Sequence, residues 1–189
     1  MSILTDATNR QFVDAEIAVA EENASYYVGM SDKIVNSYSG DLDRLMEKVK
    51  SECIDEEPSD NTLEANILEL SNLLYFVGKS SESVGIMEDL AKLASKEAYN
   101  NSYLDNSAPT DAKKKPTVAE LTAMAEDDSK YQNVINSIYA RVYRQLKFKV
   151  DAAYEMLSSL RKVLSKRMQE MQLSAVRTSG GVTFGKEEF

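Results

Sequence analysis

Three residues near the end of the sequence have the spacing of a phosphate-binding loop. Gly180, Gly185 and Lys186 match the glycine and lysine positions of the pattern G-x-x-x-x-G-K-[ST]. In such a loop, backbone N–H groups and the lysine hold phosphate oxygens, and the last hydroxyl binds Mg²⁺. Here Glu187 stands in place of the hydroxyl, and a second carboxylate follows at Glu188. Because carboxylates repel phosphate at short range, we do not expect this stretch to bind a nucleotide.

The sequence contains no histidine and a single cysteine, Cys53. A Ser-His-Asp triad or a Cys-His pair therefore cannot form within one chain, and tight zinc or other transition-metal sites are not expected. A lone thiol also cannot form an internal disulfide, which is typical of a reducing compartment. We therefore expect a protein that is not an enzyme and that holds no metal or cofactor.

Glycine and proline usage predicts long helices. The 189 residues include seven glycines and three prolines, and turns and hairpins would consume more of both. No apolar run approaches the ~20 residues that span a bilayer. The first residues, MSILTDATNRQF, lack the basic start and apolar centre of a signal peptide. We expect a cytoplasmic protein without membrane contact.

Helical periodicity predicts three or four helices in the first half of the chain. Residues 6–38 are expected to form one or two helices, Ser39–Gly40 to break the run, and Asp41 to cap a short helix. After an acidic linker, Asn61 begins a capping-box-like sequence. The helix that follows is expected to reach about residue 101. Its predicted apolar face consists of Leu63, Ile67, Leu70, Leu74, Val77, Val84, Met87, Ala91 and Ala94.

The second half is expected to contain a loop, a short helix and one very long helix. The polar stretch at about 102–116 has the composition of a loop, and Thr117 with Glu120 forms a capping-box signal. From Ser129 to Ser174 there is no glycine or proline. Apolar residues there recur every three or four positions, as in a coiled coil: Tyr131, Ile135, Ile138, Val142, Leu146, Val150, Ala153, Leu157, Leu160, Leu164, Met168 and Met171.

One small chain cannot cover the whole apolar stripe of a helix this long. It would extend on the order of 65–70 Å at 1.5 Å per residue, so we expect it to pack on the preceding helix and on other copies. The predicted fold is all-α, a long antiparallel helical hairpin with a coiled-coil-like C-terminal helix and short N-terminal helices. The expected parts are an N-terminal extension (1–40), a hairpin domain (41–174) and a flexible acidic tail (175–189).

Charge is distributed unevenly along the chain. The first 100 residues carry 8 basic and 20 acidic side chains, whereas residues 101–189 carry 14 basic and 11 acidic ones. Two interpretations are open for the basic last helix: it contacts a polyanion, or it pairs with the acidic first half. The basic side chains of that helix are Arg141, Arg144, Lys147, Lys149, Arg161, Lys162, Lys166 and Arg167.

The order of these segments resembles a known family, the UvsY-type recombination mediators of tailed bacteriophages. The resemblance covers about residues 41–174 and rests on DLDRLMEKVKSECIDEEPSDNTLEANILELSNLLYFVGKSS, IMEDLAKLASKEAYNNSYLDN, KKPTVAELTAMAEDDSKY and the long last helix. It implies a protein without an active site that binds single-stranded DNA as a ring-like homo-oligomer. It also implies two protein partners, a phage recombinase and a single-strand-binding protein, in the cytoplasm of an infected bacterial host.

The family's DNA-contacting stretch corresponds to AKLASKEAYNNSYLDN, which offers Lys92, Lys96, Tyr99 and Tyr103. Lysines can neutralise phosphates, and tyrosine rings can stack on bases. The stretch is poorer in basic residues than the family pattern. The structural alternative is that both lysines are solvated and both tyrosines pack within the hairpin. The basic run Lys113, Lys114 and Lys115 offers a further phosphate contact or a solvated loop.

The final residues resemble the acidic, phenylalanine-ended tails of single-strand-binding proteins. Glu187, Glu188 and Phe189 are the candidate partner-docking residues, and an idle tail is the alternative. For the whole chain, the alternative function is an oligomeric coiled-coil structural or assembly protein that binds no nucleic acid.

Overall fold

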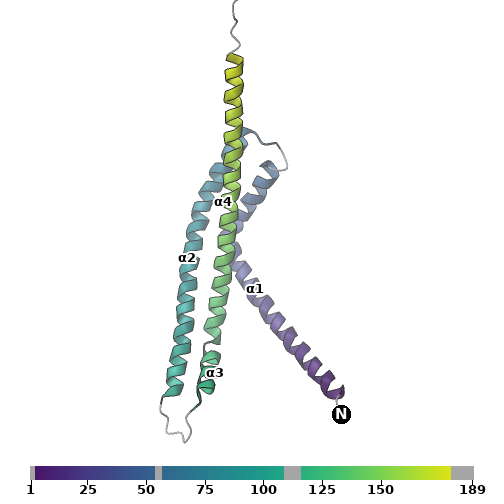
Figure 1. Cartoon of the computed structure of the whole chain (residues 1–189), viewed down its shortest axis with the longest axis vertical. Helices are drawn as coiled ribbons and strands as arrows, with labels where there is room; N and C mark the ends of the chain where they lie inside the picture. Colours follow the sequence, from purple (N-terminus) through teal and green to yellow (C-terminus); the bar gives the residue numbers. More distant parts are fainter. Residues whose placement is uncertain (1–2, 54–56, 109–115, 180–189) are drawn as a thin grey trace, which may run out of the picture. The chain divides into compact units, whose positions relative to one another are not determined.

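The computed structural model describes residues 3–53, 57–108 and 116–179, and these ranges confirm the all-α class. They contain four helices and no strand: α1 (Ile3–Cys53), α2 (Asp60–Ser107), α3 (Val118–Asp128) and α4 (Lys130–Ser179) (Figure 1). In these same ranges, no helix is both long enough and apolar enough to cross a bilayer.

The chain divides into two packed units, to which α1, α2 and α4 all contribute. Unit 1 consists of Met1–Gly40 and Gly78–Phe148, and unit 2 consists of Asp41–Val77 and Lys149–Phe189. Each unit has its own hydrophobic cluster. The three-part division expected from the sequence stays a prediction.

Unit 2 has a core of large aliphatic side chains from three helices. Their spacing of three or four residues places them on one face of each helix. The buried members are Leu42, Leu45 and Val49 of α1, Leu63, Leu70, Leu74 and Val77 of α2, and Val150, Ala153, Leu157 and Leu160 of α4. Burial of each large member stabilises the unit by about 1.5–3 kcal/mol before the cost of chain ordering.

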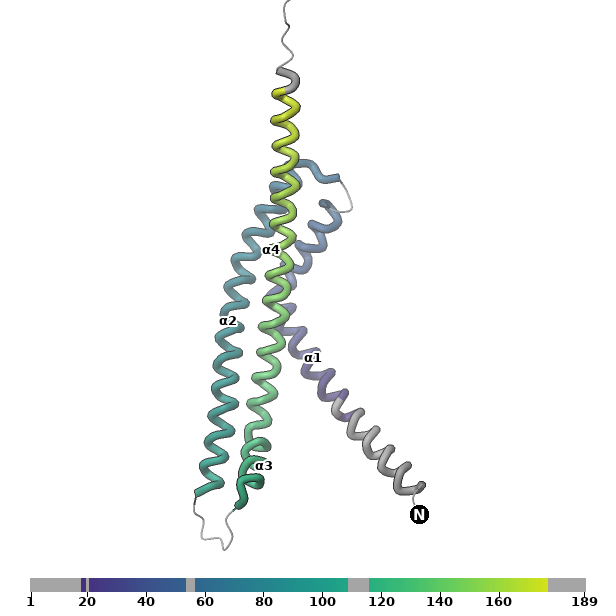
Figure 2. The backbone as a smooth tube through the Cα atoms, in the orientation of Figure 1, coloured from purple at the N-terminus to yellow at the C-terminus, as the bar shows by residue number. Residues whose placement is uncertain are grey.

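Unit 1 has a smaller core with many short side chains. Its hydrophobic cluster contains Val35 of α1, Val84 of α2, and Val142 and Leu146 of α4. Along α2, the other buried residues of this unit are Ser81, Ala91, Ser95 and Ser102. The α2 and α4 helices run side by side here (Figure 2). A Cβ atom added to Gly85 would lie 3.1 Å from the Tyr143 ring, so glycine permits this close approach.

Two hydrogen bonds join α2 to its neighbours in unit 1, one to α4 and one to α3. The Ser95 hydroxyl donates to the Asn133 side chain, and the Ser102 hydroxyl donates to Asp128 Oδ2 at 2.5 Å. Asn133 belongs to α4 and Asp128 is the last residue of α3. As the residue numbers rise along α2, the numbers of these partners fall, which fits an antiparallel arrangement of α2 with the α3–α4 segment.

The expected helix break at Ser39–Gly40 is wrong. The α1 helix continues from Ile3 to Cys53, so Asp41 is an interior residue and not a cap. Glycine inside a helix costs about 1 kcal/mol, and packing on both sides of Gly40 outweighs this. Val35 and Leu42 are both buried, and the Ser39 hydroxyl donates back to the Val35 carbonyl.

Three other expected boundaries also differ. The α2 helix begins at Asp60, and Ser59, not Asn61, caps it by accepting a hydrogen bond from the Thr62 N–H at 3.1 Å. It extends to Ser107, so part of the expected 102–116 loop is helical. The α4 helix extends to Ser179, into the expected tail.

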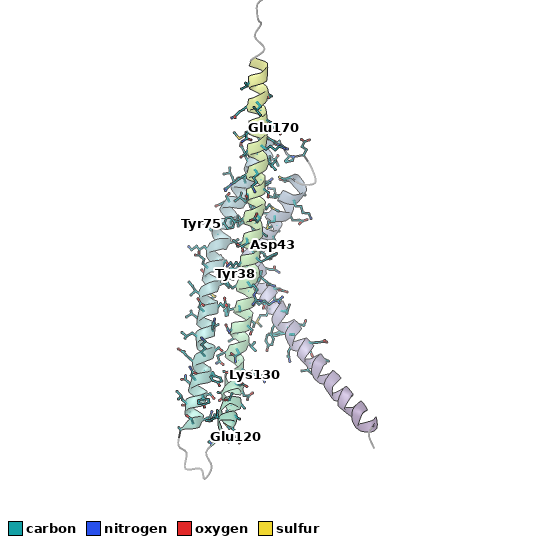
Figure 3. All side chains as sticks on the ribbon, viewed as in Figure 1. Tyr38, Asp43, Tyr75, Glu120, Lys130 and Glu170 are labelled. Carbon is teal, nitrogen blue, oxygen red and sulfur yellow. The ribbon has the colours of Figure 1, made fainter. Side chains whose placement is uncertain are left out.

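The predicted capping box at the start of α3 is confirmed. The Thr117 N–H donates to Glu120 Oε2 at 2.7 Å, and the Glu120 N–H donates to the Thr117 hydroxyl at 3.3 Å. Glu120 lies at this helix start in Figure 3. The hydrogen bond from the Thr117 backbone, together with that from the hydroxyl, lowers the pKa of Glu120 below its ordinary value.

Replacement of Thr117 with alanine is expected to destabilise the start of α3 by about 1 kcal/mol. Because the folded-state pKa of Glu120 is lowered, the contribution of the box is present above the ordinary glutamate pKa. It is lost as the pH falls through the lowered value. Hydrogen exchange of the first amides of α3, measured in wild type and Thr117→Ala, should show faster exchange in the variant. Protection that does not depend on Thr117 would contradict the assignment.

The predicted apolar stripe of α4 is covered only in its middle. Val142 and Leu146 are buried in unit 1, and the stripe from Val150 to Leu160 is buried in unit 2. At the ends, Tyr131 is 71% exposed and Met171 is 54% exposed. A single chain therefore covers more of the stripe than the sequence argument allowed, and both ends stay open.

Candidate nucleic-acid interface

The four candidate DNA-contacting residues of α2 lie on one face of the helix in unit 1. Lys92, Lys96, Tyr99 and Tyr103 are spaced by four, three and four residues, which aligns them along a helix. The two lysines are exposed, and the two tyrosines are half-buried. We call these four residues the lysine–tyrosine face.

The two tyrosines stack on each other. Their ring centroids are 6.4 Å apart, and the ring planes differ by 21°. This distance is within the range of favourable aromatic pairs. One surface of each ring therefore contacts the other ring, and the remaining exposed ring surface is what a base could reach. From the sequence, the tyrosines were expected either to stack on bases or to pack within the hairpin. In the structure they pack against each other and yet are not fully buried, so both interpretations hold in part.

Neither lysine of this face is neutralised by the rest of the described chain. Among the side chains that the structure describes, no ion pair to Lys92 or Lys96 is found, and both lysines are exposed. Acidic residues do lie on the same helix, at Asp89, Glu97 and Asp105. They lower the local positive potential, so any phosphate contact here depends on the individual lysines more than on a broad basic field.

Six further site residues were predicted from the sequence. Lys113, Lys114 and Lys115 lie outside the described residues, as do Glu187, Glu188 and Phe189. Their predicted roles stay predictions.

The basic residues of α4 divide between the two interpretations. In unit 1, Arg141 pairs with Asp32 at 3.6 Å. In unit 2, Lys149 pairs with Asp43, and Arg167 contacts both Asp60 at 3.2 Å and the Pro58 carbonyl at 2.6 Å. These three cations neutralise carboxylates of the acidic first half. By contrast, Arg144, Lys147 and Lys162 have no ion-pair partner in the described part of the chain.

A second basic surface on α4 combines cations that the sequence had singled out with a tyrosine that it had not, Tyr154. In unit 2, one side of α4 forms a shallow recess of about 550 Å³ lined by Tyr154, Leu157, Ser158, Arg161, Lys162, Ser165, Lys166 and Gln169. Arg161 donates to the Ser71 hydroxyl at 3.3 Å, and Lys166 lies 3.9 Å from Glu170. The spacing of Tyr154, Arg161 and Ser165 is a helical-face signal that could have revealed it.

An apolar groove in unit 1 was also not foreseen. The α1 residues Tyr27 and Val28 face Val134 and Ile138 of α4 across a groove of about 400 Å³, with the buried Ser31 among its lining residues. The approach of Tyr27 and Val28 to α4 depends on tertiary packing between segments far apart in the sequence.

Metal-binding groups do not gather in the described ranges. No cluster of three or more cysteine, aspartate or glutamate side chains there could hold a metal ion. Cys53 is half-buried, and its Sγ accepts a hydrogen bond from the Asn66 side-chain amide at 3.3 Å.

Comparison of the chain with protein-family models, with curated proteins and with solved structures found no match in any of the three.

Proposed function

We propose that this protein is a recombination mediator similar to the UvsY-type proteins of tailed phages. In this proposal it binds single-stranded DNA as a homo-oligomer and helps to load a phage recombinase in place of a single-strand-binding protein. The observation that supports the proposal best is the lysine–tyrosine face. It presents two exposed ammonium groups without ion-pair partners in the described chain beside two half-buried tyrosine rings.

The chemistry of this face suits a single strand more than a duplex. Phosphates of any nucleic acid can contact Lys92 and Lys96, but only unpaired bases can turn out to stack on a tyrosine. Stacking contributes about 1–3 kcal/mol per base and tolerates any base sequence. The face would therefore bind single strands without sequence preference, as a mediator requires.

The proposal is tested by fluorescence anisotropy with labelled single-stranded and duplex oligonucleotides across a salt series. Release of counterions from two phosphates per chain gives an expected slope of log K against log salt of about −1.4 per protomer. Single strands should bind more tightly than duplexes of equal length. Equal affinity for both, or no binding at low salt, would refute the proposed function.

A second candidate function, an oligomeric structural or assembly protein, is favoured by exposed large apolar side chains. Tyr75 and Phe76 of α2 in unit 2 are 68% and 56% exposed and contact each other edge to face. Exposed apolar residues of this size mark surfaces that other molecules cover. A purely structural protein would self-associate and yet show no preference for single strands in the same salt series.

A further inference from the structure

In unit 1, α2 carries its small side chains on the inside and large apolar side chains on the outside. Its buried residues here are mostly serine and alanine, whereas Ile86, Leu90 and Leu93 are 62%, 60% and 52% exposed. Side chains project from α2 on both of its sides in this region (Figure 3). Large aliphatic residues on the outer side of a helix, opposite a small-residue inner side, indicate that another surface covers them.

The exposed residues have the spacing of a coiled-coil seam. Ile86, Leu90 and Leu93 are separated by four and three residues, and the same register continues through the polar residues Glu97 and Asn100 to Leu104. Asp89 and Lys96 flank this seam on one side, one heptad apart. Both are exposed, and neither has an ion-pair partner in the residues with described side chains. We call Ile86, Leu90, Leu93 and Leu104 the outer seam.

The outer seam is complementary to itself in one orientation. If two copies pack antiparallel about a two-fold axis between Leu90 and Leu93, Leu90 of each copy faces Leu93 of the other. In that register, Asp89 of each copy lies opposite Lys96 of the other, so two ion pairs form by symmetry. Glu97 then lies over Ile86 of the second copy, where its aliphatic stem can cover the isoleucine while its carboxylate reaches solvent.

A parallel pairing lacks this complementarity. It would place Glu97 beside Glu97 of the second copy within the seam, and like charges at that position are destabilising. It would also leave Asp89 and Lys96 without opposite charges across the interface, because the flanking position that faces Lys96 holds Asn101.

We propose that the outer seam of α2 is a two-fold, antiparallel contact between two copies of this chain. The inference deepens the homo-oligomer of the proposed function by naming the surface through which copies associate. Lys96 belongs both to this contact and to the lysine–tyrosine face, whereas Lys92 belongs only to the latter. DNA binding and self-association can therefore be separated by substitution.

The first test is sedimentation velocity of the full chain over a micromolar concentration series without DNA. Wild type should self-associate, and Leu90→Glu combined with Leu93→Glu should shift the dissociation constant upward at least tenfold. Leu68→Glu is the matched control, because Leu68 is a similarly exposed leucine of α2, 70% exposed, that lies outside the seam. Circular dichroism should show unchanged helix content, since all three sites are exposed.

A charge exchange tests the register. Asp89→Lys and Lys96→Asp should each weaken self-association several-fold, because each brings like charges together, and the double variant should restore it. Absence of restoration in the double variant would overturn the antiparallel register. Self-association that persists in the Leu90/Leu93 variant but disappears on deletion of residues 180–189 would overturn the proposed surface.

Failure of this proposal is distinguishable from failure of the proposed function. Lys92→Glu should weaken single-strand binding and leave sedimentation unchanged, whereas Asp89→Lys should alter sedimentation. Loss of the first effect alone refutes the DNA-binding face. Loss of the second alone refutes the contact between copies.

Discussion

Replacement of Leu70 with alanine is expected to lower the free energy of unfolding of unit 2 by about 2–5 kcal/mol. Leu70 is fully buried and lies in the cluster formed with α1 and α4 residues such as Leu45 and Leu157. Truncation removes the transfer free energy of the lost methyl and methylene groups and leaves a cavity that neighbours fill only in part. A loss of this size is a large fraction of the stability of a small domain.

Urea denaturation followed by circular dichroism measures this loss. The matched control is Leu68→Ala on the same helix, where the leucine is 70% exposed and truncation should cost less than about 0.5 kcal/mol. Equal midpoints for the two variants would show that the face of α2 bearing Leu70 is not the buried one.

Replacement of Tyr99 with alanine is expected to weaken binding to single-stranded DNA by about 5–150-fold. This corresponds to the loss of about 1–3 kcal/mol of base stacking. Tyr99 is half-buried and stacked on Tyr103, so the substitution also removes one partner of this pair.

Replacement of Lys92 with alanine should act differently. It should lower the slope of log K against log salt by about 0.7, because one phosphate contact is lost.

Two controls separate these effects from general damage. Tyr26→Ala is the control for Tyr99→Ala, because Tyr26 of α1 also has a tyrosine neighbour. Its ring contacts that of Tyr27 edge to face, with the ring centroids 5.7 Å apart. Lys79→Ala removes another exposed lysine of α2. Neither control should change DNA affinity by more than about twofold on the scale of surface substitutions. Loss of affinity in the controls equal to that in Tyr99→Ala would leave no special role for the lysine–tyrosine face.

One local signal in the sequence predicted local structure correctly, whereas the caps expected at Asp41 and Asn61 did not form. The Thr117–Glu120 box depends only on residues three apart, and it forms as expected. The alignment of Lys92, Lys96 and Tyr99 follows from helical spacing alone, whereas Tyr103 joins them because α2 extends past its expected end at about residue 101. By contrast, the break predicted at Gly40 did not occur, because burial of the neighbouring Val35 and Leu42 depends on distant segments that no local window contains.

The limits of periodicity are clearest on α2. Of the stripe that was assigned to the inner face, six residues are buried, Ile67 is half-buried, and Met87 and Ala94 are exposed; the buried six are Leu63, Leu70, Leu74, Val77, Val84 and Ala91. The same helix bears a second set of apolar residues, including Leu90 and Leu93, that periodicity did not assign to any face. When a helix has apolar residues on two sides, either side matches the spacing of a buried face. Its sequence therefore does not show which side packs against the rest of the chain.

The small inner side chains of α2 in unit 1 have a thermodynamic consequence. Melting of unit 2 hydrates many leucines and valines, so most of the increase in heat capacity on unfolding should come from that unit. Unit 1 depends more on directional bonds such as Ser102 to Asp128. Because hydrophobic stabilisation weakens on cooling, unit 2 should lose relatively more of its stability toward 0 °C than unit 1.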